Sequence, residues 1–145
     1  MSNTFVKDIM KNTVISIDSS LTVKDAAKMM EDSGVGCVVV MENGVATGIL
    51  TERDFVRKIA AHEKSLSTPV KEVMSSPLIV INPDETVWEL AELMKQRRIH
   101  KVPVVNEGRL VGIATSTDLT RICSVGSESE MRKICDQILL RMKPN

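Results

Sequence analysis

A chain of 145 residues with 43% hydrophobic residues can bury the core of one compact domain or of two very small ones. Its 19 basic and 19 acidic residues balance, so no net charge attracts it to nucleic acid or to an anionic membrane. Aromatic residues make up only 2%, which excludes the stacking surfaces of single-stranded nucleic-acid binders and indicates an aliphatic core. Nucleic acid and membranes are therefore not expected as partners.

The cysteines and the apolar runs indicate in which cellular compartment the protein is expected. The three cysteines are odd in number and lack C-x-x-C spacing, so no disulfide framework or zinc knuckle is expected, and Cys123 and Cys135 are assigned to packing. The longest apolar run, Val35 to Met41, is too short to cross a bilayer, and no export signal opens the chain. We therefore expect a cytoplasmic protein.

The chain contains an internal duplication. Val6-Lys7-Asp8-Ile9-Met10 reappears as Val70-Lys71-Glu72-Val73-Met74, and the correspondence continues at a constant offset as far as Arg57 and Arg121. We expect a first repeat at residues 1–64, a second at 65–125 and an extension at 126–145.

Each repeat opens with a strand, a helix and a hairpin. A short apolar strand is expected at Val14 to Ile17 and again at Leu78 to Ile81, each followed by a helix whose apolar residues recur at helical spacing. The hairpin turns are expected at Glu42-Asn43-Gly44 and Asn106-Glu107-Gly108, where glycine can adopt positive φ. The sequence therefore predicts β-α-β-β in both repeats.

A second helix closes each repeat, beginning at Glu52 and at Ser116. The unit is then β-α-β-β-α, which cannot cover its own sheet. We expect an α/β (α+β) fold of two pseudo-symmetric repeats packed sheet to sheet, plus a C-terminal helix. That helix is indicated by a capping box at Ser127-x-x-Glu130. Its apolar stripe consists of Met131, Ile134, Ile138, Leu139 and Met142.

Two equivalent segments carry the candidate chemistry: Gly48 to Asp54 and Gly112 to Asp118. Each places a hydroxyl and a carboxylate where a strand ends and a helix begins, and the N–H groups there favour a phosphate. The carboxylate could accept two hydrogen bonds from a ribose diol. Thr-x-x-Asp is equally a helix cap followed by an acid in the first turn, so a structural interpretation stays open.

The element order, the duplication and the G-h-x-T-x-x-D segment in both copies make the chain resemble a tandem pair of cystathionine β-synthase (CBS) domains over roughly residues 5 to 124. The resemblance implies a regulatory, non-catalytic module that binds AMP, ADP, ATP or a related adenosyl ligand in clefts between the repeats. It implies no resident cofactor. With no effector domain fused, the module would act in trans on an effector protein.

The resemblance also implies two sets of ligand-binding residues in this sequence, one for each cleft. The first cleft would comprise Thr13, Ile15, His100, Lys101, Ile113, Thr115, Thr117 and Asp118. The second would comprise Ile49, Thr51, Arg53, Asp54, Pro77 and Ile79. Gly36 and Cys37 stand where His100 and Lys101 stand in the other copy, so the Asp118 cleft is expected to bind more tightly.

The alternatives to a ligand-binding module are an enzyme and a structural module. An enzyme is not expected, because no catalytic motif or metal-ligand spacing is present. A structural or protein-interaction module with unoccupied clefts would keep the same fold. The resemblance also implies a homodimer, because paired repeats of this family usually pack their exposed helices against a second pair, and two-fold association is the commonest solution. Its candidate surface comprises Met29, Met30, Leu93, Met94 and the terminal helix.

Overall fold

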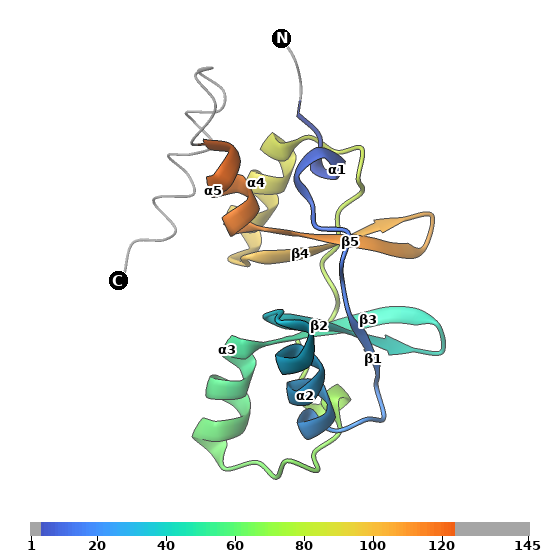
Figure 1. Cartoon of the computed structure of the whole chain (residues 1–145), viewed down its shortest axis with the longest axis vertical. Coiled ribbons are helices and arrows are strands. Elements are labelled where there is room, and N and C mark those ends of the chain that lie inside the picture. The colour runs from blue at the N-terminus through green and yellow to red at the C-terminus, as the bar shows by residue number, and fades with distance from the viewer. Residues whose placement is uncertain (1–3, 124–145) are drawn as a thin grey trace. The chain divides into compact units, whose positions relative to one another are not determined.

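The computed structural model describes residues 4–123, which form two compact units (Figure 1). The middle unit consists of Val14–Ile79. The terminal unit combines the chain up to Thr13 with the chain from Val80 onward. Each is a small sheet with helices, which confirms the predicted mixed α/β fold. The predicted extension at 126–145 and its helix lie outside the described residues.

The middle unit is a three-stranded sheet covered by helices. Its strands are β1 (Ser16–Asp18), β2 (Cys37–Glu42) and β3 (Val45–Thr51). Its helical elements are α2 (Val23–Ser33), α3 (Glu52–Asp54), the π-helical η1 (Phe55–Ile59), and the 3₁₀ turns η2 (Ala60–His62) and η3 (Val70–Glu72). β1 is parallel to β2, and β2 is antiparallel to β3. Residues 37–40 of β2 are all buried, as expected for a covered central strand.

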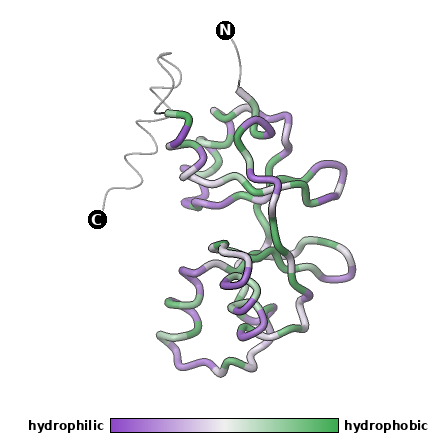
Figure 2. The backbone as a smooth tube through the Cα atoms, in the orientation of Figure 1, coloured by the Kyte–Doolittle hydropathy of each residue, from purple (hydrophilic) through white to green (hydrophobic). Residues whose placement is uncertain are grey.

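The terminal unit repeats this plan with a smaller sheet. Its helices are α1 (Val6–Ile9), α4 (Val87–Arg97) and α5 (Ser116–Cys123), and its strands are β4 (Lys101–Asn106) and β5 (Arg109–Thr115). Leu90, Val102, Val104 and Leu119 are fully buried in its aliphatic core. Figure 2 shows hydrophobic residues running along the strands of both units.

The strand predicted at Leu78 to Ile81 does not form. Only a parallel bridge between Ile81 and Val104 remains. In the middle unit, the Val39 N–H donates to the Ile15 carbonyl at 3.0 Å. Pro103 occupies the position of Val39 in the terminal unit, and a proline has no N–H to donate. The sheet of the terminal unit is therefore reduced to the β4–β5 hairpin.

The hairpin turns have the predicted conformation. Asn43 and Gly44 have φ of 52° and 78°, and Glu107 and Gly108 have φ of 50° and 77°. Positive φ at both central residues gives the backbone twist that suits a two-residue hairpin. The two repeats thus turn in the same way at equivalent places.

The compact units do not coincide with runs of consecutive sequence, because the opening segments are exchanged. In the terminal unit, the Val6 N–H donates to the Glu85 carbonyl at 2.8 Å. In the middle unit, the Val70 N–H donates to the Leu21 carbonyl, also at 2.8 Å. The segment that opens each repeat therefore folds into the unit formed mainly by the other repeat.

This exchange explains the glycine that opens each G-h-x-T-x-x-D segment. A Cβ built on Gly112 would lie 2.6 Å from the Lys11 carbonyl oxygen. On Gly48, it would lie 2.9 Å from the Ser75 carbonyl oxygen and 2.5 Å from the Met74 sulfur. Both exchanged segments therefore run so close to the edge of β3 or β5 that a larger residue does not fit.

The cysteines only partly follow expectation. Cys37 is buried in β2, consistent with a structural thiol. Cys123, at the end of α5, packs against the core of the terminal unit as expected, and it is also disulfide-bonded, which was not expected. The odd number of cysteines and the absence of framework or metal-ligand spacings give no signal for this bond.

Candidate ligand-binding sites

The Asp118 carboxylate is the centre of the candidate site in the terminal unit. It has no solvent exposure. Its Oδ2 accepts hydrogen bonds from the Thr115 N–H and the Thr115 hydroxyl, both at 2.9 Å, and the Asp118 N–H donates back to the hydroxyl oxygen at 3.2 Å. Its Oδ1 accepts from Arg121 Nη2 at 2.6 Å. A buried carboxylate is stable only when it is bonded in this way.

The middle unit repeats the arrangement around Asp54, which is 8% exposed. Asp54 Oδ2 accepts from the Thr51 N–H at 2.9 Å and from the Thr51 hydroxyl at 3.3 Å. The cation here is Lys58, whose Nζ lies 3.3 Å from Asp54 Oδ1. Lys58 also donates to the Val73 carbonyl at 3.1 Å and to Ser75 Oγ at 3.0 Å. Asp54 is thereby tied to the exchanged segment of its unit.

The two cations occupy different sequence positions because the helices differ. Arg121 reaches Asp118 from three residues along the regular helix α5. The middle unit becomes π-helical directly after Asp54, and Lys58 reaches the carboxylate from four residues along. Arg57, the sequence counterpart of Arg121, is exposed. A π-helical turn accommodates one extra residue and is frequent at functional sites.

In the terminal unit, most of the predicted residues gather around β4 and β5. Lys101 pairs with Thr115 across the hairpin, and the Ser116 N–H donates to the His100 carbonyl at 2.9 Å. Ile113 bonds to Lys11 through both backbone groups, two residues before Thr13. Thr117 is exposed on the first turn of α5. Ile15 belongs to the middle unit.

The second predicted set lies entirely in the middle unit. Ile49 bonds to Ser75 through both backbone groups, two residues before Pro77, and Ile79 ends the unit. Arg53 is exposed. The equivalents of the basic pair are also in place: Cys37 pairs with Thr51, and the Glu52 N–H donates to the Gly36 carbonyl at 3.1 Å. Gly36 and Cys37 therefore make the same backbone contacts in the middle unit as His100 and Lys101 make in the terminal unit.

Sequence reasoning missed Arg121, Lys58 and Ser75. The i,i+3 spacing of Asp118 and Arg121 was a usable signal, since such pairs face each other on a helix. Lys58 and Ser75 carried no comparable signal, because their contact depends on the π-helical turn and on the exchanged segment.

The capping interpretation is correct, and burial adds to it. Both Thr-x-x-Asp segments form capping boxes, as do Thr22 with Asp25 and Thr86 with Glu89 at the starts of α2 and α4. The N–H and the hydroxyl of Thr22 lower the pKa of Asp25. Within residues 4–123, the charged residues that are buried are Asp54 and Asp118. Burial distinguishes these two carboxylates from ordinary caps.

The described part of the chain offers neither a metal site nor a membrane span. No three His, Cys, Asp or Glu side chains in residues 4–123 are grouped so that they could hold a metal ion. Within the same residues, no helix is both long and apolar enough to cross a membrane.

Comparison with known families identifies the duplicated fold. The family model described as "CBS domain" matches twice, at residues 6–61 and 70–124. The chain therefore belongs to the CBS domain family and contains a pair of these domains, which confirms the resemblance seen in the sequence.

Individual relatives agree with this assignment. A CBS domain-containing protein of Bacillus subtilis, YhcV, is 38% identical over 114 residues, covering 79% of this chain and 81% of the relative. The crystal structure of the CBS domain protein TA0289 from Thermoplasma acidophilum matches with a TM-score of 0.80 and 27% identity, covering 97% of this chain and 76% of that one.

One solved neighbour was crystallised with ligands. The CBS domain pair of protein MJ0100, in complex with 5′-methylthioadenosine and S-adenosyl-L-methionine, matches with a TM-score of 0.77 and 30% identity. The match covers 86% of this chain and 98% of that one.

Proposed function

We propose that this chain is a regulatory ligand-sensing module that binds an adenosyl ligand, such as AMP or ATP, and acts on a separate effector protein. The observation that carries the proposal is the pair of buried carboxylates, Asp118 and Asp54, each at a strand-to-helix junction. Capping alone does not require burial, as the partly exposed Asp25 and the exposed Glu89 demonstrate. The adenosyl ligands of MJ0100 support the ligand class.

The residues of the terminal unit suit the parts of a nucleotide. Each carboxylate oxygen has more than one lone pair, but Asp118 has no solvent exposure, so ribose hydroxyls would reach it only when the exposed Arg121 side chain moves away from Oδ1. At the start of α5 the Ser116 N–H and the Asp118 N–H are already bonded to the His100 carbonyl and the Thr115 hydroxyl, so the phosphate contact is assigned to Lys101, which begins β4 on the strand beside Thr115. None of these residues is assigned a role in making or breaking a covalent bond. We therefore propose that the site binds its ligand without catalysis.

Titration calorimetry against AMP, ADP, ATP, S-adenosylmethionine, 5′-methylthioadenosine and NAD tests the proposal directly. We expect saturable binding of at least one of these compounds and no turnover of any. The competing candidate is a structural module with unoccupied sites. It predicts no heat of binding for the whole panel at millimolar ligand, with folding and oligomeric state unchanged.

Lys101→Ala is expected to weaken phosphorylated ligands more than adenosine. A charge-assisted hydrogen bond contributes about 1.5–3 kcal/mol. The loss of one such contact to a phosphate should therefore lower the affinity by about tenfold or more. Adenosine, which has no phosphate, should lose less than about twofold by the same reasoning. Calorimetry with both ligands measures the ratio. Lys95→Ala, on the exposed part of α4, is the matched control. Equal losses for ATP and adenosine would remove Lys101 from the phosphate site.

A further inference from the structure

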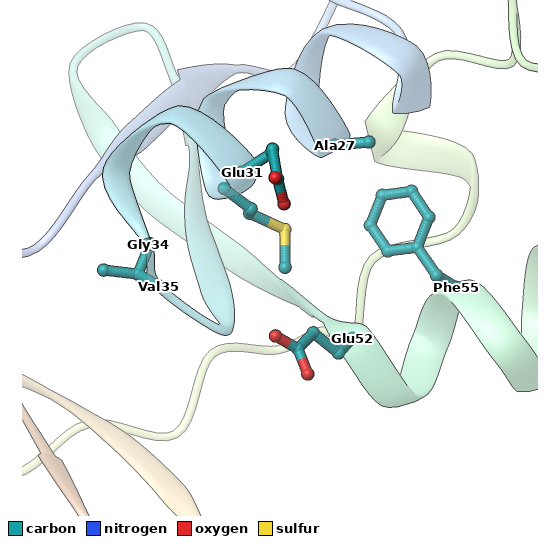
Figure 3. Close-up of a pocket in the computed structure, with 7 residues that line it drawn as sticks. Ala27, Glu31, Gly34, Val35, Glu52 and Phe55 are labelled. Atoms are coloured by element: carbon teal, nitrogen blue, oxygen red, sulfur yellow. The ribbon is translucent and has the colours of Figure 1, made fainter.

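The middle unit contains a pocket of about 430 Å³ on its helical side, between the end of α2 and the start of the next helix (Figure 3). It is lined by Ala27, Met30, Glu31, Gly34, Val35, Glu52 and Phe55. None of these residues belongs to the Asp54 site or to either predicted set of ligand-binding residues, although Met30 belongs to the predicted dimer surface. The size falls within the range of protein ligand pockets.

The duplicated chain shows why this pocket exists. In the terminal unit, the counterparts of Phe55 and Ala27 are Leu119, which is fully buried, and Ala91, which is 3% exposed. Phe55 and Ala27 are only partly buried. Phe55 is the first residue of the π-helical η1, whereas Leu119 lies in the regular helix α5. The same positions that are packed in one unit line a pocket in the other.

The pocket combines an apolar surface with negative charge. Figure 3 shows the Glu31 side chain extending from α2 and the Glu52 side chain from α3, with the Phe55 ring beside them. The lining includes no basic residue. The counterparts of Glu31 and Glu52 in the terminal unit are Lys95 and Ser116, so the acidic character is also specific to the middle unit. A cation carried on an apolar body is complementary to this surface.

The chain itself contains a segment with this chemistry, beyond the described residues. Residues 131–143 have four basic residues and one acidic residue, interleaved with the apolar stripe noted above. Arg141 and Lys143 directly flank Met142. We propose that this pocket receives segment 131–143 of a second copy of the chain. Reciprocal exchange places the same contact twice in a two-fold dimer, and each contact then strengthens the other.

A charge-swap mixing experiment tests the proposal in the full-length chain. Variant A carries Glu31→Lys and Glu52→Lys, and variant B carries Arg141→Glu and Lys143→Glu. In each variant alone, pocket and segment have the same sign, and the dimer dissociation constant should rise by about tenfold or more. In an equimolar mixture, both contacts of the A–B pair regain opposite charge. Sedimentation analysis should therefore show association restored to near the unchanged level.

The matched control is Asp32→Lys with Glu42→Lys, which changes the same charge on exposed residues of the middle unit that do not line the pocket. This double variant should dimerise normally. A melting curve for every variant confirms folding, and the substituted residues Glu31 and Glu52 are exposed. Full dimerisation of A and B alone, or a mixture that associates no better than its components, would overturn the proposal. A monomeric unchanged chain would also overturn it.

A labelled peptide of residues 127–145 provides an independent measurement. It should bind the unchanged full-length chain in competition with the resident segment, and binding to variant A should be at least about tenfold weaker. Equal binding to variant A and to the Asp32/Glu42 control would place the segment elsewhere. Adenosyl ligand binding is read separately by calorimetry, so failure here leaves the proposed function standing.

Discussion

Asp118→Asn should weaken binding of the adenosyl ligand by roughly tenfold to a hundredfold. The amide keeps the shape of the side chain but removes the charge that would accept the ribose hydroxyls, and hydrogen bonds to charged groups contribute about 1.5–3 kcal/mol. Asp118 is completely buried, so alanine would add a cavity to this loss. Calorimetry with the ligand that binds best in the panel measures the effect.

The substitution also damages a helix cap, and the control separates the two effects. Asp25→Asn disrupts the equivalent capping box of α2, where the Thr22 N–H donates to Asp25 Oδ2 at 3.0 Å. Asp25→Asn should lose about 1 kcal/mol as a cap, and Asp118→Asn should lose more, because its amide places an N–H group against the Thr115 or Arg121 donors at a buried position. Only Asp118→Asn should lose ligand affinity. Equal affinities for the two variants would reduce Asp118 to a structural role.

Asp54→Asn tests the ranking of the two sites. The Asp54 site has Gly36 and Cys37 where the other site has His100 and Lys101, so the high-affinity phase should survive this change. Lys58, which the sequence did not indicate, already faces the Asp54 carboxylate and donates to the Val73 carbonyl and Ser75 Oγ, so its ammonium group is largely engaged within the protein. If Asp54→Asn proved the more damaging variant, the phosphate contact would belong to Arg53 or Lys58 and the ranking would be wrong.

Gly112→Ala should destabilise the fold by about 1–3 kcal/mol, since overpacking a close contact forces the backbone to shift. The new Cβ would lie 2.6 Å from the Lys11 carbonyl oxygen, which is backbone and cannot rotate away. Denaturant unfolding followed by circular dichroism measures the change.

Gly48→Ala is the matched variant in the middle unit. Its nearest neighbour is the flexible Met74 side chain, and its nearest backbone oxygen lies at 2.9 Å, so the loss should be smaller. A change below about 0.5 kcal/mol for Gly112→Ala, the level of an ordinary surface substitution, would show that the exchanged segment is not held tightly there.

The sequence predicted those features that depend on local pattern. Both hairpins, the helices α2 and α4 and the two capping motifs follow from periodicity, turn glycines and spacing within a few residues. The missing strand at Leu78 to Ile81 was foreseeable in principle. Pro103 lies within the strand that would have paired with it and supplies no N–H at the critical position.

The features that were missed depend on contacts between distant parts of the chain or on helix register. Lys58 reaches Asp54 only because the helix widens after Asp54, and no propensity rule places a π-helical turn there. Phe55, which lines the pocket, is the first residue of this π-helical turn. The exchange of opening segments cannot be read from the duplication alone, but the family resemblance implied it by grouping Thr13 with Asp118 and Pro77 with Asp54, and the structure places both residues in those units.

That exchange also determines the order in which the chain can fold as it leaves a ribosome. Synthesis proceeds from the N-terminus, and the middle unit is one continuous stretch that is complete once Ile79 has emerged. The helix α1 emerges earliest of the described elements, yet its partners Glu85 and Pro83 come much later. Its apolar residues Val6 and Ile9, which are buried in the folded protein, therefore lack their packing partners until the terminal unit has been translated. The helix α1, although it precedes the other described elements in the chain, is among the last of them to pack against its partners.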